Sequence, residues 1–246
     1  MARYGDYPEY VPVSAKKAKA QKQIEKLRKK NPNLAPVVLE GRSIARTWWG
    51  KAWNHNLELY ADYSNRLARG RSYVRTGSVL DLQIDTGTVT AMVQGSRRTP
   101  YTVQVQIDPL PERQLKNIVR ICDQRITDLE QLIAGKFPKE LGELFTAKGQ
   151  GLFPTNKEIH FDCTCPDWAS MCKHVTAVLY GVGARFDGDP MLFFTLRNID
   201  FHLLLKKTIE QKMESMLKNA GKSTNRVLAD PDVFGLFGIK EDGEDG

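Results

Sequence analysis

Three of the four cysteines in this chain lie within twelve residues of one another, together with a histidine. Cys163 and Cys165 are separated by one residue, and Cys172 and His174 repeat that spacing after a gap of six residues. Three thiolates and an imidazole complete a tetrahedral zinc site, with Zn–S bonds of about 2.3 Å and Zn–N bonds of about 2.0–2.1 Å. Because catalytic zinc keeps one position open for water, this closed set predicts one structural Zn²⁺ ion and no catalytic residue.

Two other interpretations of these residues are ordinary core positions and a disulfide bond. An odd number of clustered cysteines in a reducing compartment argues against the disulfide. The competing imidazole, His160, alternates with Cys163 along a predicted strand and therefore faces away from the thiolates. Cys122 is expected in the core, and His55 and His202 have no metal-like neighbours.

The ligands need a strand and a helix to bring them together. A strand near residues 157–163 would point both cysteines of the first pair to one side. In a helix expected from about 174 to 184, residues two apart point roughly 200° from one another. We therefore expect Cys172 in the loop before the helix and His174 in its first turn. Trp168 is expected to pack over the site and shield it.

The rest of the chain predicts an α+β fold, in which a small antiparallel sheet with packed helices precedes a zinc-stabilised β-α module and C-terminal helices. Trp49 and Trp53 recur at helical spacing with Trp48 beside them, and all three are interpreted as core residues in preference to a base-stacking platform. The expected elements are a helix at 47–67, strands at 79–84, 89–93 and 103–107, helices at 111–134 and 138–147, and, after the module, helices starting near Asp189 and at 201–217.

Four units are expected along the 246 residues: a basic flexible arm (1–40), an α+β domain (41–150), the zinc module with trailing helices (151–220) and a loosely ordered acidic tail (221–246). The net charge is +7, and residues 16–30 alone supply +7 through seven Lys and one Arg against one Glu. The charge therefore belongs to one arm, while the rest of the chain is balanced.

Cations without acidic neighbours in the sequence are candidates for contact with nucleic-acid phosphates. Against this, the arm could be a solubilising tail and the arginines an ordinary solvated face. The candidate contacts are Lys16, Lys17, Lys19, Lys22, Lys26, Arg66, Arg69, Arg71, Arg75, Arg97 and Arg98.

Motifs for other activities are missing from the sequence. It contains neither a G-x-x-x-x-G-K-[ST] phosphate loop nor a G-x-S-x-G nucleophile elbow. Asp187 and Asp189 could be imagined as a hydrolytic carboxylate pair, but helix capping explains Asp189 without catalysis. No apolar run is long enough to span a membrane and the start does not resemble a secretory signal, so we expect a cytoplasmic protein without membrane contact.

The segment 163–180, CTCPDWASMCKHVTAVLY, resembles the SWIM zinc finger, whose pattern is Cys-x-Cys, a variable spacer and Cys-x-His. The resemblance extends through residues 187–197 and to Trp48-Trp49-Gly50, Gly95-Ser96-Arg97 and Pro100-Tyr101, as in bacterial partners of Swi/Snf-type helicase-like ATPases. Asn198 stands where that group has glycine.

The resemblance implies zinc binding and contact with DNA or protein. We therefore expect a non-catalytic accessory protein that binds nucleic acid, with DNA as the expected ligand, and that recruits or positions a helicase-like ATPase. The alternative is a protein–protein adaptor with structural zinc and no nucleic-acid contact, and a metal-dependent hydrolase is a distant third. The oligomeric state is left open by the sequence.

Overall fold

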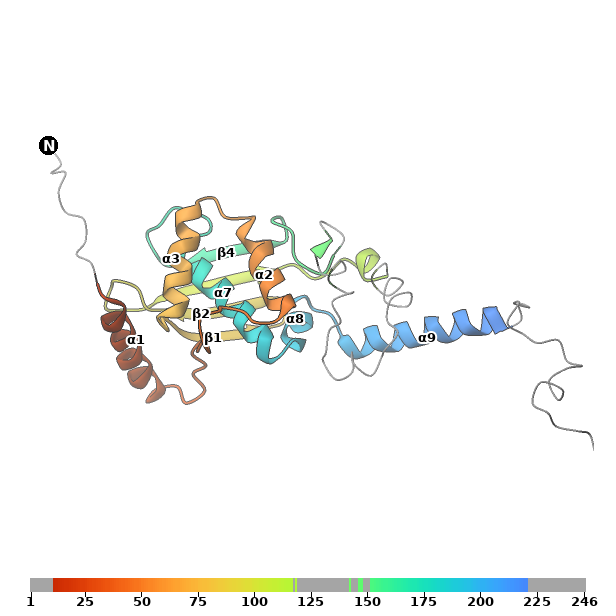
Figure 1. The fold of residues 1–246 in the computed structure, drawn as a ribbon, viewed down its shortest axis with the longest axis horizontal. Coiled ribbons are helices and arrows are strands. Elements are labelled where there is room, and N and C mark those ends of the chain that lie inside the picture. Colours follow the sequence, from red (N-terminus) through yellow and green to blue (C-terminus); the bar gives the residue numbers. More distant parts are fainter. Residues whose placement is uncertain (1–10, 117, 119–141, 143–145, 148–150, 221–246) are drawn as a thin grey trace, which may run out of the picture.

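A four-stranded antiparallel sheet in the order β1-β2-β3-β4 lies at the centre of the molecule (Figure 1). The computed structural model describes residues 11–116, 118, 142, 146–147 and 151–220. The strands are β1 (Val79–Asp85), β2 (Thr88–Val93), β3 (Tyr101–Ile107) and β4 (Ile159–Cys163). This sheet and its helices confirm the expected α+β class.

The predicted hairpin is present, and its turn explains a glycine. Thr86 and Gly87 join β1 to β2, and Gly87 has φ +67°, a left-handed conformation that glycine adopts without steric cost. From there the period of two places alternate β2 and β3 residues on opposite faces. One face is buried under helices, whereas Thr90, Thr102 and His160 are exposed on the other.

α7 (Lys173–Gly188) lies against the buried face, and α2 (Trp48–Glu58) and α3 (Ser64–Arg75) pack on α7 (Figure 1). α7 is the central one, and nearly all of its residues from His174 to Gly183 are buried. α2 is fixed to it by indole N–H groups, which donate from Trp53 to the Leu179 carbonyl at 3.0 Å and from Trp49 to the Phe186 carbonyl at 2.9 Å.

The single helix expected at 47–67 is wrong, because the chain forms two helices separated by residues 59–63. Both helices pack on α7. A single straight helix over residues 47–67 could not place both segments against α7, so the chain turns between them. Trp53 and Leu57 bury the first helix, while Gly70 and Val74 bury the second. The apolar residues whose spacing predicts one helix are therefore divided between α2, the residues after it and α3.

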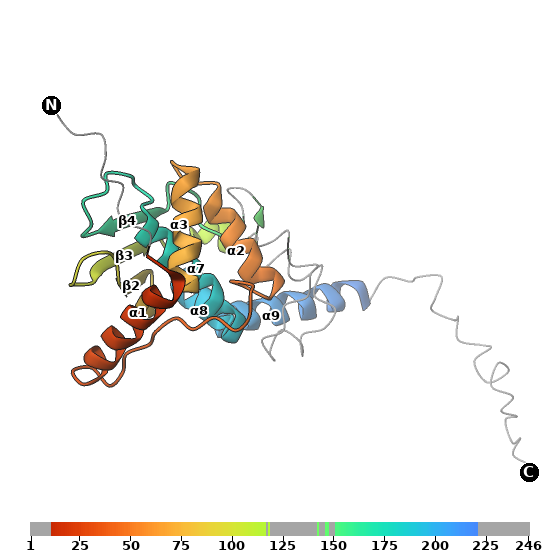
Figure 2. The ribbon, with the colours of Figure 1, turned by 60° about the vertical axis from the view of Figure 1, so that its left-hand side comes forward.

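The lysine-rich helix α1 (Val13–Arg28) is docked and not a flexible arm over its described part. Ala20 and Ile24 pack against Leu34 and Leu80. The ammonium group of Lys19 donates to the carbonyl oxygens of residues 95, 96 and 97 at 3.0, 3.0 and 3.2 Å. The apolar contact and the hydrogen bonds together hold α1 against the β1 edge and the β2–β3 loop (Figure 2).

One hydrophobic core runs from Val37 to Ile199, across the domain boundary expected at residue 150. β4 pairs with β3 along its whole length, with Cys163 opposite Val103. The strand expected to begin the zinc module is thus the fourth strand of the shared sheet. Residues on the two sides of that boundary do not form separate cores.

After α7 the chain forms α8 (Met191–Leu196) and α9 (Phe201–Ala220), and α9 extends away from the sheet (Figures 1 and 2). The helix break expected at 198–200 is confirmed. Asn198 has φ +53°, and asparagine tolerates this left-handed conformation better than most residues with a side chain.

Some predictions fall on residues that the structure does not describe. They are most of the helices at 111–134 and 138–147, Cys122, and the tail 221–246. None of the described helices combines the length and the apolarity needed to cross a bilayer.

Candidate metal centre

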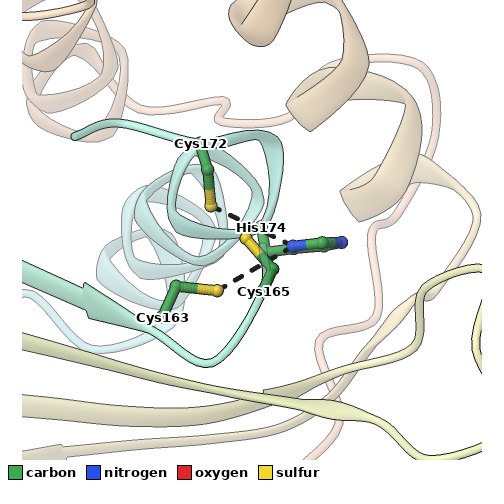
Figure 3. Close-up of side chains that lie close together, drawn as sticks. All are labelled: Cys163, Cys165, Cys172 and His174. Atoms are coloured by element: carbon green, nitrogen blue, oxygen red, sulfur yellow. Dashed lines mark hydrogen bonds between the residues drawn. The ribbon is translucent and has the colours of Figure 1, made fainter. Parts of the chain in front are cut away.

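The four predicted ligands lie together where β4 leads into α7 (Figure 3). Cys163 is the last residue of β4, Cys165 lies in the following loop, Cys172 caps the start of α7, and His174 is in its first turn. The expected division between loop and helix is therefore present. All four ligand atoms lie within 4.8 Å of one another, so the group could hold a metal ion.

The geometry of the donor atoms fits one small ion. His174 Nδ1 lies 3.9 Å from Cys163 Sγ and 4.0 Å from Cys172 Sγ. Around a tetrahedral zinc ion, the bond lengths for sulfur and nitrogen place ligand atoms about 3.5–3.8 Å apart. A slight contraction would bring the present atoms to those separations.

Backbone N–H groups also favour metal binding by the thiols. The amides of Cys165, Asp167 and Val175 donate to the sulfur atoms of Cys163, Cys165 and Cys172, respectively, and each of these bonds favours the thiolate. The backbone thus supplies donors that suit negatively charged sulfur.

The protons of the three thiols are strongly interdependent. Hydrogen bonding from the Cys163 thiol lowers the pKa of Cys172 to about 4, whereas the same contact raises the pKa of Cys163. Burial raises the pKa of Cys165. Three thiolates this close repel one another, so a bound cation is needed for all three to ionise.

Aromatic packing orients the imidazole. His174 stacks on Tyr101 with a centroid separation of 4.4 Å and meets the edge of Tyr73 at 5.3 Å. Gly95 lies against both the tyrosine and the imidazole, since an added Cβ would come within 2.4 Å of Tyr101 Cε2 and 3.2 Å of His174 Nε2. Nε2 is buried without a hydrogen-bond partner in the described chain, so packing alone aims Nδ1 at the sulfurs.

These supporting residues were not predicted as part of the site. The sequence indicates Gly95 and Tyr101 only through the outlying segments of the SWIM resemblance, which is the one signal that could identify them. Their role becomes visible because the β2–β3 loop folds back over α7.

Asp62 holds the loop between the two ligand pairs. Its carboxylate accepts from the backbone N–H groups of Ser170 at 2.9 Å and Met171 at 3.2 Å. Burial would raise the pKa of Asp62, but these bonds hold it below its ordinary value. No local sequence pattern could reveal this contact, because it joins residues more than a hundred positions apart.

Trp168 does not shield the metal site, contrary to expectation. Its side chain is 78% exposed and meets Tyr63 edge-on, with ring centroids 5.2 Å apart. The rings of Tyr73 and Tyr101 already enclose the imidazole. The indole of Trp168 instead lies at the surface, on the loop beside Tyr63 and the start of α3.

Three of the eleven predicted nucleic-acid contacts form hydrogen bonds or ion pairs with other parts of the chain, although Lys19 among them is also exposed. Lys19 binds backbone carbonyls, Arg66 pairs with Asp167 at 2.9 Å, and Arg71 pairs with Glu58 at 2.6 Å. Lys16 is partly buried. The other seven are exposed, namely Lys17, Lys22, Lys26, Arg69, Arg75, Arg97 and Arg98.

A groove of about 1020 Å³ lies between α1, residues 36–42 and α3. Its charged lining residues are Lys17, Arg42 and Arg75, and no acidic residue is among the described residues that line it. A neighbouring hollow of about 490 Å³ shares Arg42 and Arg75 and adds Lys51 together with the ion pair Arg71–Glu58. Arg42 and Lys51 were absent from the predicted contacts, since only the fold places them beside α3.

Asp187 and Asp189 have partners that explain their positions. Asp187 accepts from the backbone N–H groups of Arg46 at 2.6 Å and Thr47 at 3.0 Å, at the start of α2. Asp189 accepts from the N–H of Met191 at 2.9 Å, but the N-cap of α8 is Pro190 and not Asp189 as expected. Asp187 thus binds the two amides that precede α2, and Asp189 binds the first amide of α8.

The chain is similar to one curated protein, the uncharacterized protein Rv2102 of Mycobacterium tuberculosis. The two are 39% identical over 156 residues, which are 63% of this chain and 56% of the relative. The chain thus spans little more than half the length of the relative that it matches. No protein-family model and no solved structure matches this chain.

Proposed function

We propose that this protein is a non-catalytic zinc-binding accessory protein, which binds nucleic acid and recruits or positions a helicase-like ATPase. Zinc is proposed as the metal because three thiols and one imidazole, all from the protein, are typical of structural zinc sites. The likeness of Cys163, Cys165, Cys172 and His174 to the SWIM pattern supports the same choice.

The groove beside α3 is the observation that carries the nucleic-acid proposal. Lys17, Arg42 and Arg75 come from three separate segments and meet around one hollow without an acidic side chain in its described lining. Cations gathered in this way neutralise phosphates and release the counterions around them. Binding should therefore weaken steeply as the salt concentration rises.

The apolar floor of the same groove favours a second candidate, the protein–protein adaptor. Val38 is 78% exposed there, and an acidic peptide with apolar side chains would suit both the floor and the cations. Other apolar residues that line the groove include Val13, Ile24, Val37, Leu39 and Val74.

A salt series on DNA and RNA tests the nucleic-acid proposal. Replacing Lys17, Arg42 and Arg75 by Gln should lower the slope of log affinity against log salt by about 3, one for each lost phosphate contact. The matched control replaces Lys157, Lys206 and Lys207, which are exposed and do not line the groove. Equal effects of the two triple variants, or no binding by the zinc-loaded protein at low salt, would favour the adaptor.

Affinity purification tests the ATPase part. The tagged protein should retain a Swi/Snf-type ATPase after nuclease treatment, and the two should still associate in high salt. Recovery of other proteins without any such ATPase would contradict this part and leave the nucleic-acid result unaffected.

A further inference from the structure

Trp168 is a large aromatic side chain that the fold leaves in water. It is 78% exposed, whereas Trp53 is completely buried and Trp48 and Trp49 are half-buried against the core. Indoles supply much of the binding energy where proteins meet ligands, because they offer a large rigid surface with little entropy to lose. The exposed face of this residue is thus a candidate contact surface.

The loop that carries Trp168 is held at both ends and in the middle. Cys165 and Cys172 fix its ends at the metal centre, and Asp62 holds its backbone at residues 170 and 171. Asp167, immediately before the indole, accepts from the Arg66 guanidinium at 2.9 Å. The indole is therefore presented in a fixed position, which reduces the entropy cost of binding.

Basic residues lie near this aromatic pair, and two of them, Arg66 and Lys173, already pair with Asp167. The guanidinium carbon of Arg66 lies 6.0 Å from the ring centroid of Tyr63, and Lys173 Nζ lies 4.0 Å from Asp167. Arg69 follows one turn later on α3 and is exposed. Aromatic faces next to cations are the combination that binds single-stranded nucleic acid, since bases stack while the cations attract phosphates.

The aromatic pair and the basic groove lie at opposite ends of the same helix. α3 starts at Ser64, directly after Tyr63, and ends at Arg75 in the groove. Its twelve residues span about 18 Å. Figure 1 shows the loop between β4 and α7 beside the start of α3. One nucleic-acid strand could therefore contact both surfaces along α3.

We propose that Trp168 and Tyr63 form a stacking site for an unpaired base of single-stranded nucleic acid. This proposal rests on the proposed function and names its substrate class. A base inside a duplex is covered on both faces by its neighbours, so it cannot stack on an indole. The protein should therefore prefer single strands, and Trp168 should be the source of that preference.

Fluorescence anisotropy on zinc-loaded protein tests the site with three ligands of equal length: oligothymidylate, an abasic strand and a duplex. Trp168→Ala should weaken oligothymidylate binding by about 5- to 100-fold, the usual effect of losing one stacked base. Binding of the abasic strand and the duplex should not change. Trp168→Phe keeps a ring and should retain most of the affinity.

Leu59→Ala is the matched control, because Leu59 is another exposed apolar side chain, at the end of α2. It should leave all three ligands unaffected, and the zinc content of every variant shows that the loop is intact. If wild-type protein binds none of the ligands, the proposed function itself fails.

Salt-sensitive binding that Trp168→Ala leaves unchanged would overturn the stacking site alone. Equal loss on oligothymidylate and on the abasic strand would overturn it too, because the effect would not depend on a base. Unchanged nucleic-acid binding with loss of a co-purified protein would assign the indole to a protein partner instead.

Discussion

At the scale of single residues, Arg197 carries a charge in the interior. Its side chain is fully buried, donates to the Asp108 carbonyl at 2.7 Å and pairs with Glu158 at 3.0 Å. In the sequence this position is only the last residue of the range 187–197 over which the SWIM resemblance extends. The pair joins the end of α8 to the segment before β4, and a buried charge that loses its partner is strongly destabilising.

The pH dependence of stability should reveal this pair. Burial would raise the pKa of Glu158, but bonds from Thr155 and Arg197 hold it below the ordinary 4.5. In the acidic range the folded protein therefore binds fewer protons at Glu158 than the unfolded chain does. The ionised carboxylate makes its full contribution to the free energy of unfolding above pH 4.5, and this contribution is lost as the pH falls through the lowered pKa. Glu158→Gln should cost about 3 kcal/mol at pH 7, with a smaller difference from wild type at pH 3.

Urea unfolding at several pH values measures that difference. Glu112→Gln is the control, because Glu112 forms an exposed ion pair with Lys116 that should not contribute measurably. A constant difference between Glu158→Gln and wild type from pH 7 to pH 3 would contradict the assignment.

At the scale of elements, the contact between α3 and α7 depends on a glycine in the middle of a helix. A Cβ added to Gly70 would lie 2.4 Å from Thr176 Cγ2 and 2.6 Å from Thr176 Cβ. The two helices approach more closely than any side chain would allow. Glycine weakens an isolated helix, so its presence here is explained by packing.

Gly70→Ala should therefore destabilise the protein by about 1–3 kcal/mol through overpacking, although alanine favours helix formation. Gly188→Ala is the matched control at the end of α7, where an added Cβ meets no atom within 4 Å. Thermal and urea unfolding measure both variants. A stabilised Gly70→Ala would show that α3 and α7 can separate without cost.

At the scale of the whole molecule, the metal centre is part of the central packing. Cys163 belongs to the shared sheet and His174 to the central helix α7, so the cluster joins the two layers. Free energy from a metal bound only by the folded protein adds directly to folding stability. Loss of the ion should therefore weaken the entire core and not only the loop.

Cys172→Ser should bind less than one zinc ion per chain and should lower the free energy of unfolding by several kcal/mol, since structural zinc contributes about 10–16 kcal/mol in small zinc-finger peptides. Zinc content and thermal unfolding, before and after a chelator, check this. Cys122→Ser removes the thiol outside the cluster and should keep one zinc. An unfolding temperature that the chelator leaves unchanged would contradict a structural ion.

The sequence by itself determined the Cys3His group that could hold a metal ion, the hairpin and the fold class. Each depends on local spacing: the repeated Cys-x-Cys and Cys-x-His pairs, and the alternation around Gly87. Periodicity and ligand spacing act over a few residues, so they can be recognised before the chain is folded.

Only the tertiary structure decided which side chains remain available for binding. It divided the helix expected at 47–67, docked α1 through Lys19, paired Arg66 with Asp167 and turned Trp168 outward beside Tyr63. The last three outcomes depend on contacts between residues 76 to 105 positions apart in the chain. Local sequence preferences cannot predict contacts over such separations, because distant segments come together only when they bury one common core.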